Sequence, residues 1–370
     1  MTWTHFHTTL AHALWCVIMV CGTSLEQALA QGDSSAVRKV NTLVIPLAGY
    51  TPETGFGGGL SGIVQFKDPK SDSLTPYSTV QLTAGITTNG QWMVALPFDI
   101  YFNQRVHQIT GELSAQKSKL RFFGVGHTAA TQTDERFEAL ILRARMQYLK
   151  KLDAHLYLGG RWWYENYEVV QSEDGGLLAD NRIAGSERHT SSGPGINLVV
   201  DDRDQIYYPE KGHYLELVVH DQRQHWGSDY NYLRYRLDAR AFQRIGRRQI
   251  LATMLFGDFI RGEAPYPQLP NIGSLKRMRG YYEGRYRDYQ LSMLQMEDRI
   301  RVHRLFALSV FGSIAYMNNA QFDLKEPGWH VAGGLGLRYF WNPASRTTIR
   351  LDMALGSGKP LFYLAVGEAF

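Results

Sequence analysis

Polar and apolar side chains alternate with a period of two along most of this chain, and this alternation limits its fold more than any other feature. Arg143, Arg145 and Gln147 are each followed by an apolar residue, and Arg234 and Arg236 stand in the same alternation. Successive side chains of a β-strand point to opposite faces of its sheet. The pattern therefore predicts an all-β chain whose strands have one apolar face and one polar face rich in arginine.

The composition argues against other classes of protein. Mean hydropathy is −0.28, and the sequence contains no run of the roughly 20 apolar residues that a membrane-spanning helix needs. Aromatic residues make up 12% of the 370 residues, which is too many for a disordered chain. The net charge of +4 is a mild excess and does not indicate a nucleic acid partner.

The alternation can be divided into about sixteen segments, as expected of a membrane barrel of this length. They fall near residues 42–50, 56–66, 77–87, 91–102, 107–117, 138–149, 154–169, 190–200, 213–222, 229–243, 249–261, 290–302, 306–317, 329–340, 347–355 and 361–370. In a soluble sandwich the polar face would be the outer one. Here that face is rich in arginine, and aromatic residues such as Tyr339 and Trp341 stand near the ends of the apolar face. These features favour a transmembrane antiparallel β-barrel with lipid outside and a charged lumen inside.

The connections between the segments alternate in length from the fourth segment onward. Short turns fall at 103–104, 151–152, 246–247, 303–304 and 342–343, and long loops at 118–137, 171–189, 262–288 and 318–328. Bacterial barrels have short periplasmic turns and long extracellular loops. The alternation predicts an even number of strands and places both termini in the periplasm of an outer-membrane protein.

The N-terminus has the pattern of a cleaved signal peptide. An apolar run at 13–20 precedes Ala-Leu-Ala at 28–30, a typical signal-peptidase sequence. Both cysteines, Cys16 and Cys21, lie in this segment, so the mature chain would need no disulfide. The predicted order is a signal peptide at 1–30, a short periplasmic lead at 31–40 and a barrel at 41–370.

One long connection, residues 271–288, is rich in arginine and tyrosine and reads NIGSLKRMRGYYEGRYRD. A long loop in a compact fold is usually functional or disordered, and the tyrosines of this loop give it side chains that can pack. A solvated cationic surface loop is the plainer alternative. We predict that the loop enters from the cell exterior and folds back into the lumen.

An acidic stretch at 201–204 is the next candidate site, but its spacing is not that of a calcium-binding loop. We predict a periplasmic turn in which Arg203 ties the neighbouring carboxylates, among them Asp201 and Asp204. Gly212 would supply an unusual φ angle there.

Motifs for metal, cofactor or catalysis are missing from the sequence. It contains no His-Glu-x-x-His and no Gly-x-Ser-x-Gly, and the Gly-rich stretch at 57–62 is not followed by the helix of a dinucleotide site. We expect no catalytic residue, no metal and no cofactor. A hydrolase built from single Ser, His and Asp residues on neighbouring strands stays open as an alternative.

The C-terminal strand ends on an aromatic residue, Phe370, which would share an apolar face with Phe362, Leu364 and Val366. Such an ending resembles the signal by which outer-membrane barrels are recognised for assembly. Phe370 is therefore the expected assembly signal, and the barrel-assembly machinery is the expected insertion route.

Together these stretches resemble the bacterial surface-antigen family of outer-membrane barrels. This family includes relatives of the barrel-assembly insertase and of two-partner-secretion transporters. The most specific matches are Arg279, Gly280, Tyr281, Arg285, Tyr286, Arg287 and Asp288. Support comes from GYTPETG at 49–55, the 201–212 turn and the terminal Phe370.

The resemblance implies that the Arg-Gly-Tyr tip lies inside the barrel and that Arg279 pairs with acidic residues of the lumen wall. Glu297 matches one of the two acidic positions of the family, whereas Ser313 stands at the other. Glu297 is therefore the expected partner of Arg279, and a second acidic anchor is not expected.

The resemblance also implies a function in protein insertion into, or translocation across, the outer membrane. The lead at 31–40 leaves no room for the periplasmic transport-associated modules of the family, so the chain resembles its short branch. A separate periplasmic protein that supplies such modules is an expected partner. The alternative is a plugged barrel that is structural or binds ligands at the cell surface.

Overall fold

The computed structural model describes residues 40–51, 55–67, 75, 77–126, 133–180, 183–205, 208–319, 328–342, 346–356 and 358–370. The strands are β1 (Val40–Thr51), β2 (Gly55–Phe66), β3 (Ser78–Thr87), β4 (Trp92–Phe102), β5 (His107–Phe122), β6 (Glu135–Lys151), β7 (Leu156–Ser172), β8 (His189–Asp201), β9 (Gly212–Gln222), β10 (Tyr232–Arg244), β11 (Gln249–Gly262), β12 (Gln290–Arg301), β13 (Phe306–Asn318), β14 (Trp329–Asn342), β15 (Thr347–Leu355) and β16 (Leu361–Val366). Two short 3₁₀ helices, η4 (Gln224–Trp226) and η5 (Tyr266–Gln268), lie in the connections.

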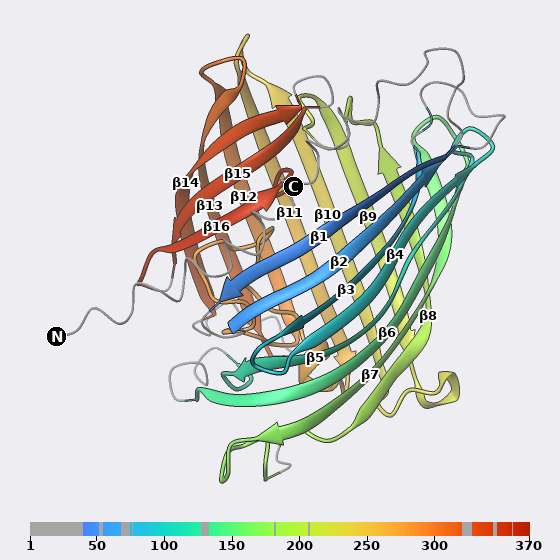
Figure 1. Ribbon diagram of the computed structural model, residues 1–370, viewed down its shortest axis with the longest axis vertical. Coiled ribbons are helices and arrows are strands. Elements are labelled where there is room, and N and C mark those ends of the chain that lie inside the picture. Colours follow the sequence, from blue (N-terminus) through green and yellow to red (C-terminus); the bar gives the residue numbers. More distant parts are fainter. Residues whose placement is uncertain are drawn as a thin grey trace.

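All sixteen strands form one antiparallel sheet in which each strand pairs with its neighbours in the sequence. The prediction of an all-β chain with about sixteen strands is therefore confirmed. The sheet curls on itself, so that the blue and green strands lie in front of the yellow ones (Figure 1). Within the described residues, β1 and β16 are the two edges of the sheet, and no ladder of hydrogen bonds joins them.

The period-two alternation sorts the side chains between the two faces. On β12, Glu297 and Arg299 are fully buried, whereas Leu294 and Met296 are exposed. The same distribution recurs on many strands. Exposed apolar residues include Val94, Leu142, Leu255, Val310, Leu335 and Leu351. Water-soluble proteins seldom bury charged side chains while exposing apolar ones in this way. The distribution is the one expected of a sheet whose exposed face meets lipid.

The connection between β11 and β12, residues 263–289, packs against the polar face of the sheet. Its Met278 and Tyr281 belong to one buried apolar cluster with residues of β10 to β14. Its Tyr266 and Leu269 belong to a second cluster with residues of β5, β6 and β7. A solvated surface loop, the plainer reading of this stretch, is therefore wrong.

The connection between β5 and β6 is shorter than predicted. β5 runs to Phe122 and β6 starts at Glu135, so much of the predicted loop at 118–137 is a strand pair. Ion pairs join the two strands there, because Lys117 and Lys119 contact Glu138 at 2.8 and 3.2 Å.

The last strand is shorter than predicted and ends at Val366 instead of Phe370. Gly367 has a φ of 80°, a value that glycine adopts readily, and the chain leaves the sheet there. The backbone N–H of Gly367 still donates to the carbonyl of Thr348 at 2.7 Å.

The turn between β8 and β9 shows part of the predicted construction, because among the described residues Arg203 is bonded to Asp201 but not to Asp204. Arg203 forms two hydrogen bonds with the carboxylate of Asp201, at 2.8 and 3.0 Å, and Asp204 accepts a backbone N–H at 2.9 Å. Gly212 has a φ of 104°, and a Cβ there would lie 2.5 Å from the carbonyl oxygen of Asp202. The backbone N–H of His213 donates to the carboxyl of Asp202 and lowers the pKa of that carboxyl.

Several predicted features lie outside the described residues. They are the signal peptide and lead up to residue 39, part of the stretch at 49–55, and most of the loop at 318–328. In the part of the chain that is described, no helix is long and apolar enough to cross a membrane.

Candidate functional site

The loop of residues 263–289 is an ordered hairpin with its own hydrogen bonds. Asn271 forms an isolated bridge with Arg287, and the N–H of Ile272 donates to the carbonyl of Tyr286 at 3.2 Å. The N–H of Gly126 donates to the carbonyl of Arg287 at 2.8 Å, which ties the loop to the segment after β5. The hairpin therefore holds its tip, residues 274–281, in a fixed position.

The tip is a tight turn whose backbone carries the sequence Met-Arg-Gly. Ser274 Oγ accepts the N–H of Arg277 at 3.0 Å, and Met278 has a φ of 48°. Gly280 has a φ of 113°, and a Cβ on it would lie 2.7 Å from the carbonyl carbon of Leu355. Only glycine tolerates both this φ and this close approach, so Gly280 lets the tip touch β15.

Arg279 projects from this turn into a fully buried site between two acids. Its Nη2 lies 2.5 Å from Glu297 Oε2 on β12, so the predicted ion pair with Glu297 is present. Its Nη1 contacts the carboxylate of Asp352 on β15. The guanidinium also lies over the ring of Phe311, 3.5 Å from its centroid. The planar guanidinium of arginine can donate hydrogen bonds to two carboxylates at once, whereas the ammonium of lysine lacks this forked arrangement of donors.

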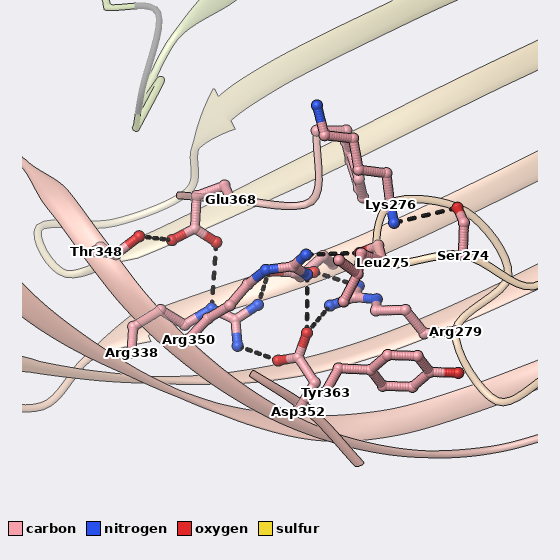
Figure 2. Close-up of polar contacts among 12 residues, drawn as sticks. Ser274, Leu275, Lys276, Arg279, Arg338, Thr348, Arg350, Asp352, Tyr363 and Glu368 are labelled. Carbon is pink, nitrogen blue, oxygen red and sulfur yellow. Dashed lines mark hydrogen bonds and ion pairs between the residues drawn. The ribbon is translucent and has the colours of Figure 1, made fainter. Parts of the chain in front are cut away.

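The two acids that hold Arg279 are shared with arginines of the sheet itself. Glu297 Oε1 accepts from Arg338 Nη2 at 2.7 Å and from Arg299 Nε at 3.1 Å. Asp352 contacts Arg338 and also accepts from Arg350 Nη1 at 2.9 Å. Figure 2 shows the Asp352 carboxylate surrounded by Arg279, Arg338 and Arg350. We call these residues, together with Glu368, the ion network.

Glu368, which follows β16, is the third acid of the ion network. Its carboxylate lies 3.2 Å from Arg338 Nε and accepts the hydroxyl of Thr348 at 2.7 Å (Figure 2). It also lies 3.6 Å from Arg299 Nε. The ion network thus contains four arginines and three carboxylates, all at most 2% exposed. A buried charge is tolerated when it is paired and hydrogen-bonded, and each of these carboxylates has at least two such partners.

Backbone groups of the tip also form hydrogen bonds with the sheet. The side-chain amide of Gln295 accepts the N–H of Met278 at 3.2 Å and donates to the carbonyl of Lys276 at 3.0 Å. Tyr363 on β16 accepts the N–H of Gly280 at 2.8 Å. The loop tip therefore contacts β12, β15 and the last strand of the sheet.

The C-terminal residue lies elsewhere than the sequence suggested. Phe370 is 4% exposed and belongs to the apolar cluster of Met278 and Tyr281, on the polar face of the sheet. Arg299 Nη2 donates to its main-chain oxygen at 3.0 Å. The prediction that Phe370 extends the apolar face of the last strand is wrong, because the turn at Gly367 and the ion pairs of Glu368 direct the segment inward.

The remaining loop residues lie in two groups. Tyr281 and Tyr286 contact each other and His330, with ring centroids 5.7 and 4.2 Å from that of His330. Arg287 donates to the carbonyl of Tyr266 at 2.8 Å and lies over its ring.

Arg285 and Asp288 do not reach the ion network through any described contact. Arg285 lies 6.0 Å from the ring centroid of Phe123, and the N–H of Asp288 donates to the carbonyl of Pro270 at 3.0 Å. The sequence motif therefore divides into an anchoring tip, Arg279 to Tyr281, and a packing arm, Arg285 to Asp288.

Sequence reasoning missed the second acidic partner of Arg279. Ser313, at the position expected for it, donates to the carbonyl of Ala332 at 3.5 Å and does not replace an acid. Asp352 supplies the carboxylate from a different strand. The sequence places Asp352 in an alternating segment with Arg350. This alternation predicts that Asp352 lies on the polar face but does not indicate which residue it contacts.

The ion network is suited to holding a segment in place and not to binding a metal. In the described residues no group of three or more His, Cys, Asp or Glu side chains could hold a metal ion. Each acid of the network is already occupied by arginine donors. The arrangement can hold the loop tip on the polar face through buried ion pairs.

The fold and this site define a class: an all-β chain with a sixteen-stranded antiparallel sheet of the BamA and CdiB barrel type. The structure is similar to BamA from Haemophilus ducreyi lacking POTRA domains 1–3, with a TM-score of 0.58 and 13% identity over 89% of this chain and 69% of that one. It is also similar to CdiB from Acinetobacter baumannii, with a TM-score of 0.58 and 11% identity over 89% and 61% of the two chains. CdiB from Escherichia coli is similar with a TM-score of 0.55 and 11% identity, over 91% of this chain and 62% of that one.

The chain thus spans less than two thirds of the length of both CdiB chains. No protein-family model matches the sequence, and no match to a curated protein was found. At these identities the likeness establishes the fold alone.

Proposed function

We propose that the chain is a bacterial outer-membrane barrel of the surface-antigen type, with its apolar face toward lipid and its polar face around a lumen. Val310 and Leu335 are exposed, whereas Glu297 and Arg338, on the other face of the sheet, are fully buried, and this supports the orientation. The loop of residues 263–289 is then the plug of the lumen. Both termini lie in the periplasm, and the barrel-assembly machinery inserts the chain.

The function we propose is assistance to protein insertion into, or translocation across, the outer membrane. The observation that carries it is the contact of the loop tip with the last strand. Tyr363 on β16 accepts the N–H of Gly280 at 2.8 Å and donates to the carbonyl of Tyr281 at 3.3 Å. Movement of the plug would therefore pull directly on an edge of the sheet, which among the described residues is not paired with the other edge. An unpaired strand edge can take up a further strand.

A reconstitution assay tests this function. The purified protein is placed in liposomes, an unfolded eight-stranded outer-membrane barrel is added, and its insertion is followed by heat-modifiable gel migration. We expect faster insertion than in empty liposomes, and a changed rate with Arg279→Ala but not with Arg188→Ala, a substitution of an exposed arginine. A rate equal to that of empty liposomes, with and without a periplasmic protein bearing transport-associated modules, would reject the proposal.

A plugged barrel that is structural or binds ligands at the surface is the second candidate. It is favoured by the second apolar cluster, in which Leu178 of the β7–β8 connection packs with Tyr266 and Leu269 of the loop. Two connections that seal against each other suit a barrel that stays closed. This candidate would be favoured if the protein did not accelerate insertion of the added barrel and its own barrel stayed closed. A lipase and protease screen of the same preparation tests the hydrolase alternative.

A further inference from the structure

A second group of arginines lies on the polar face, on strands that the ion network does not use. In the sheet register, Arg161 on β7 stands opposite Gly195 on β8, Gly195 opposite His220 on β9, and His220 opposite Arg234 on β10. These four residues form one row across the sheet. Arg145 on β6 lies beside this row, with its guanidinium 3.9 Å from the ring centroid of Trp163.

The arginines of this region outnumber their acidic partners. Glu165 is contacted by both Arg143 and Arg145, and Asp258 is contacted by both Arg234 and Arg236, at 2.6 and 3.3 Å. Two carboxylates therefore serve four guanidinium groups.

Two further arginines add to this excess. Arg161 has only a distant acid, Glu216, at 3.8 Å. Arg277 of the loop lies close to Arg234, Arg236 and Asp258 and forms no ion pair with a described residue. Glu112 stands opposite Arg145 in the sheet register, so the region holds six arginines against four carboxylates, an excess of two positive charges in a partly buried setting. Like charges so close together favour the binding of an anion.

Buried polar atoms without a partner lie among these arginines. Nε2 of His220, Nε1 of Trp163 and both amide atoms of Asn197 have no hydrogen-bond partner in the described part of the chain. His220 is 2% exposed and Asn197 is fully buried. Buried polar groups in folded proteins nearly always have a partner, and each exception calls for an explanation such as a bound ion.

The arginine side chains are still open to solvent from the polar face. The side chains of Arg145, Arg161 and Arg236 are 33, 18 and 24% exposed. Gly195 leaves room for the imidazole of His220, because a Cβ there would lie 1.9 Å from its Cδ2. The His220 and Trp163 rings meet edge to face, 5.6 Å apart. The region is therefore a partly exposed cationic patch beside the rings of His220 and Trp163, which we call the arginine patch.

We propose that the arginine patch is a binding site for a phosphate-bearing anion. A phosphate group carries roughly two negative charges and offers several strong acceptor oxygens, which suits an excess of two positive charges. Forked guanidinium donors match such oxygens in pairs. A single carboxylate would neutralise only one of the two charges. The site is independent of the loop anchor and does not rest on the proposed function in protein insertion.

Calorimetric titration of the detergent-solubilised protein tests this proposal. The probes are inorganic phosphate, pyrophosphate, glucose 6-phosphate and acetate, all at one ionic strength. We expect one-site binding of at least one phosphate compound and much weaker binding of acetate. Tighter binding of glucose 6-phosphate than of inorganic phosphate would identify a phosphate ester as the ligand class, and the reverse order would identify free phosphate. Absence of binding in the millimolar range, or equal binding of acetate, would overturn the proposal.

Two substitutions and one control locate the binding. Arg277→Gln removes a cation that has no ion pair, and Arg236→Gln leaves Asp258 paired with Arg234, so neither strands a buried acid. Each should weaken phosphate binding by about tenfold, the loss expected for a hydrogen bond to a charged group. Arg188→Gln, which changes the net charge equally at a side chain that is 68% exposed, should leave binding unchanged. A similar loss in all three proteins, or none in the first two, would show that the arginine patch is not the site. Heat-modifiable migration of each variant confirms that the barrel is folded.

Discussion

At the scale of single residues, Arg279 is the point where loop and sheet meet. Its guanidinium spans Glu297 and Asp352, and each of these carboxylates contacts two other arginines. The resemblance to surface-antigen barrels identified Arg279 and Glu297 because both stand in recognisable positions. It could not identify Asp352, because the curvature that brings β15 to the loop tip leaves no local pattern in the sequence.

This sharing of acids predicts that Arg279→Ala and Glu297→Gln act differently. Arg279→Ala leaves Glu297 and Asp352 with arginine partners and reduces the ion network to three arginines and three acids. It should free the loop with little loss of barrel stability. Glu297→Gln removes a partner of three buried arginines and should destabilise the barrel by about 3–5 kcal/mol.

Chymotrypsin digestion and thermal unfolding in detergent separate these effects. Cleavage between residues 263 and 289 should rise strongly in Arg279→Ala, and the midpoint of unfolding should fall more in Glu297→Gln. Equal midpoints for the two variants, or a protected loop in Arg279→Ala, would contradict this assignment.

Gly280 gives a prediction with a matched control. Gly280→Ala should displace the loop tip, because its φ is 113° and a Cβ would meet the backbone of Leu355 at 2.7 Å. Gly90 also has a positive φ, of 77°, but nothing lies within 4 Å of a Cβ there. Gly90→Ala therefore carries the conformational strain of about 1 kcal/mol without the collision. Protease sensitivity of the loop should rise in Gly280→Ala alone, and a rise in both variants would attribute it to backbone strain.

At the scale of elements, the segment after β16 differs most from expectation. An alternating apolar strand ending in phenylalanine predicted a continuous strand to Phe370, and this pattern remains compatible with recognition for assembly. The pattern carries no information on Gly367, whose positive φ ends the strand, or on the arginines that hold Glu368. Glycine is permitted in a strand as well as in a turn, so the sequence alone could not decide between the two.

Phe370→Ala should therefore have two effects that can be measured separately. Removing a buried ring from the cluster with Met278 and Tyr281 should cost about 3–5 kcal/mol and loosen the loop. If Phe370 is also the assembly signal, the amount of protein in the outer membrane should fall more than its synthesis does.

Phe102→Ala, at a phenylalanine that is 41% exposed, is the control for loss of a ring. An unchanged amount of Phe370→Ala protein in the outer membrane would contradict a role of Phe370 in assembly. An unchanged stability against unfolding would contradict its packing in the apolar cluster.

At the scale of the whole molecule, the number, order and faces of the strands could be predicted, whereas the contacts across the polar face could not. In the lipid environment that we propose, each strand would expose apolar side chains on one face, which explains the period-two pattern of the segments. The contacts of Arg279 with Asp352 and of Phe370 with Arg299 join residues 73 and 71 positions apart. Such contacts depend on how the sheet curls and on where the loop enters.

The central claim is that the loop of residues 263–289 plugs a lumen and is held there by Arg279. Its most direct test is the ion conductance of the purified protein in planar lipid bilayers, compared between the wild type and Arg279→Ala. The account predicts a small conductance for the wild type, a several-fold larger one for Arg279→Ala, and no change for Arg188→Ala. A folded Arg279→Ala barrel with the same conductance as the wild type would contradict it.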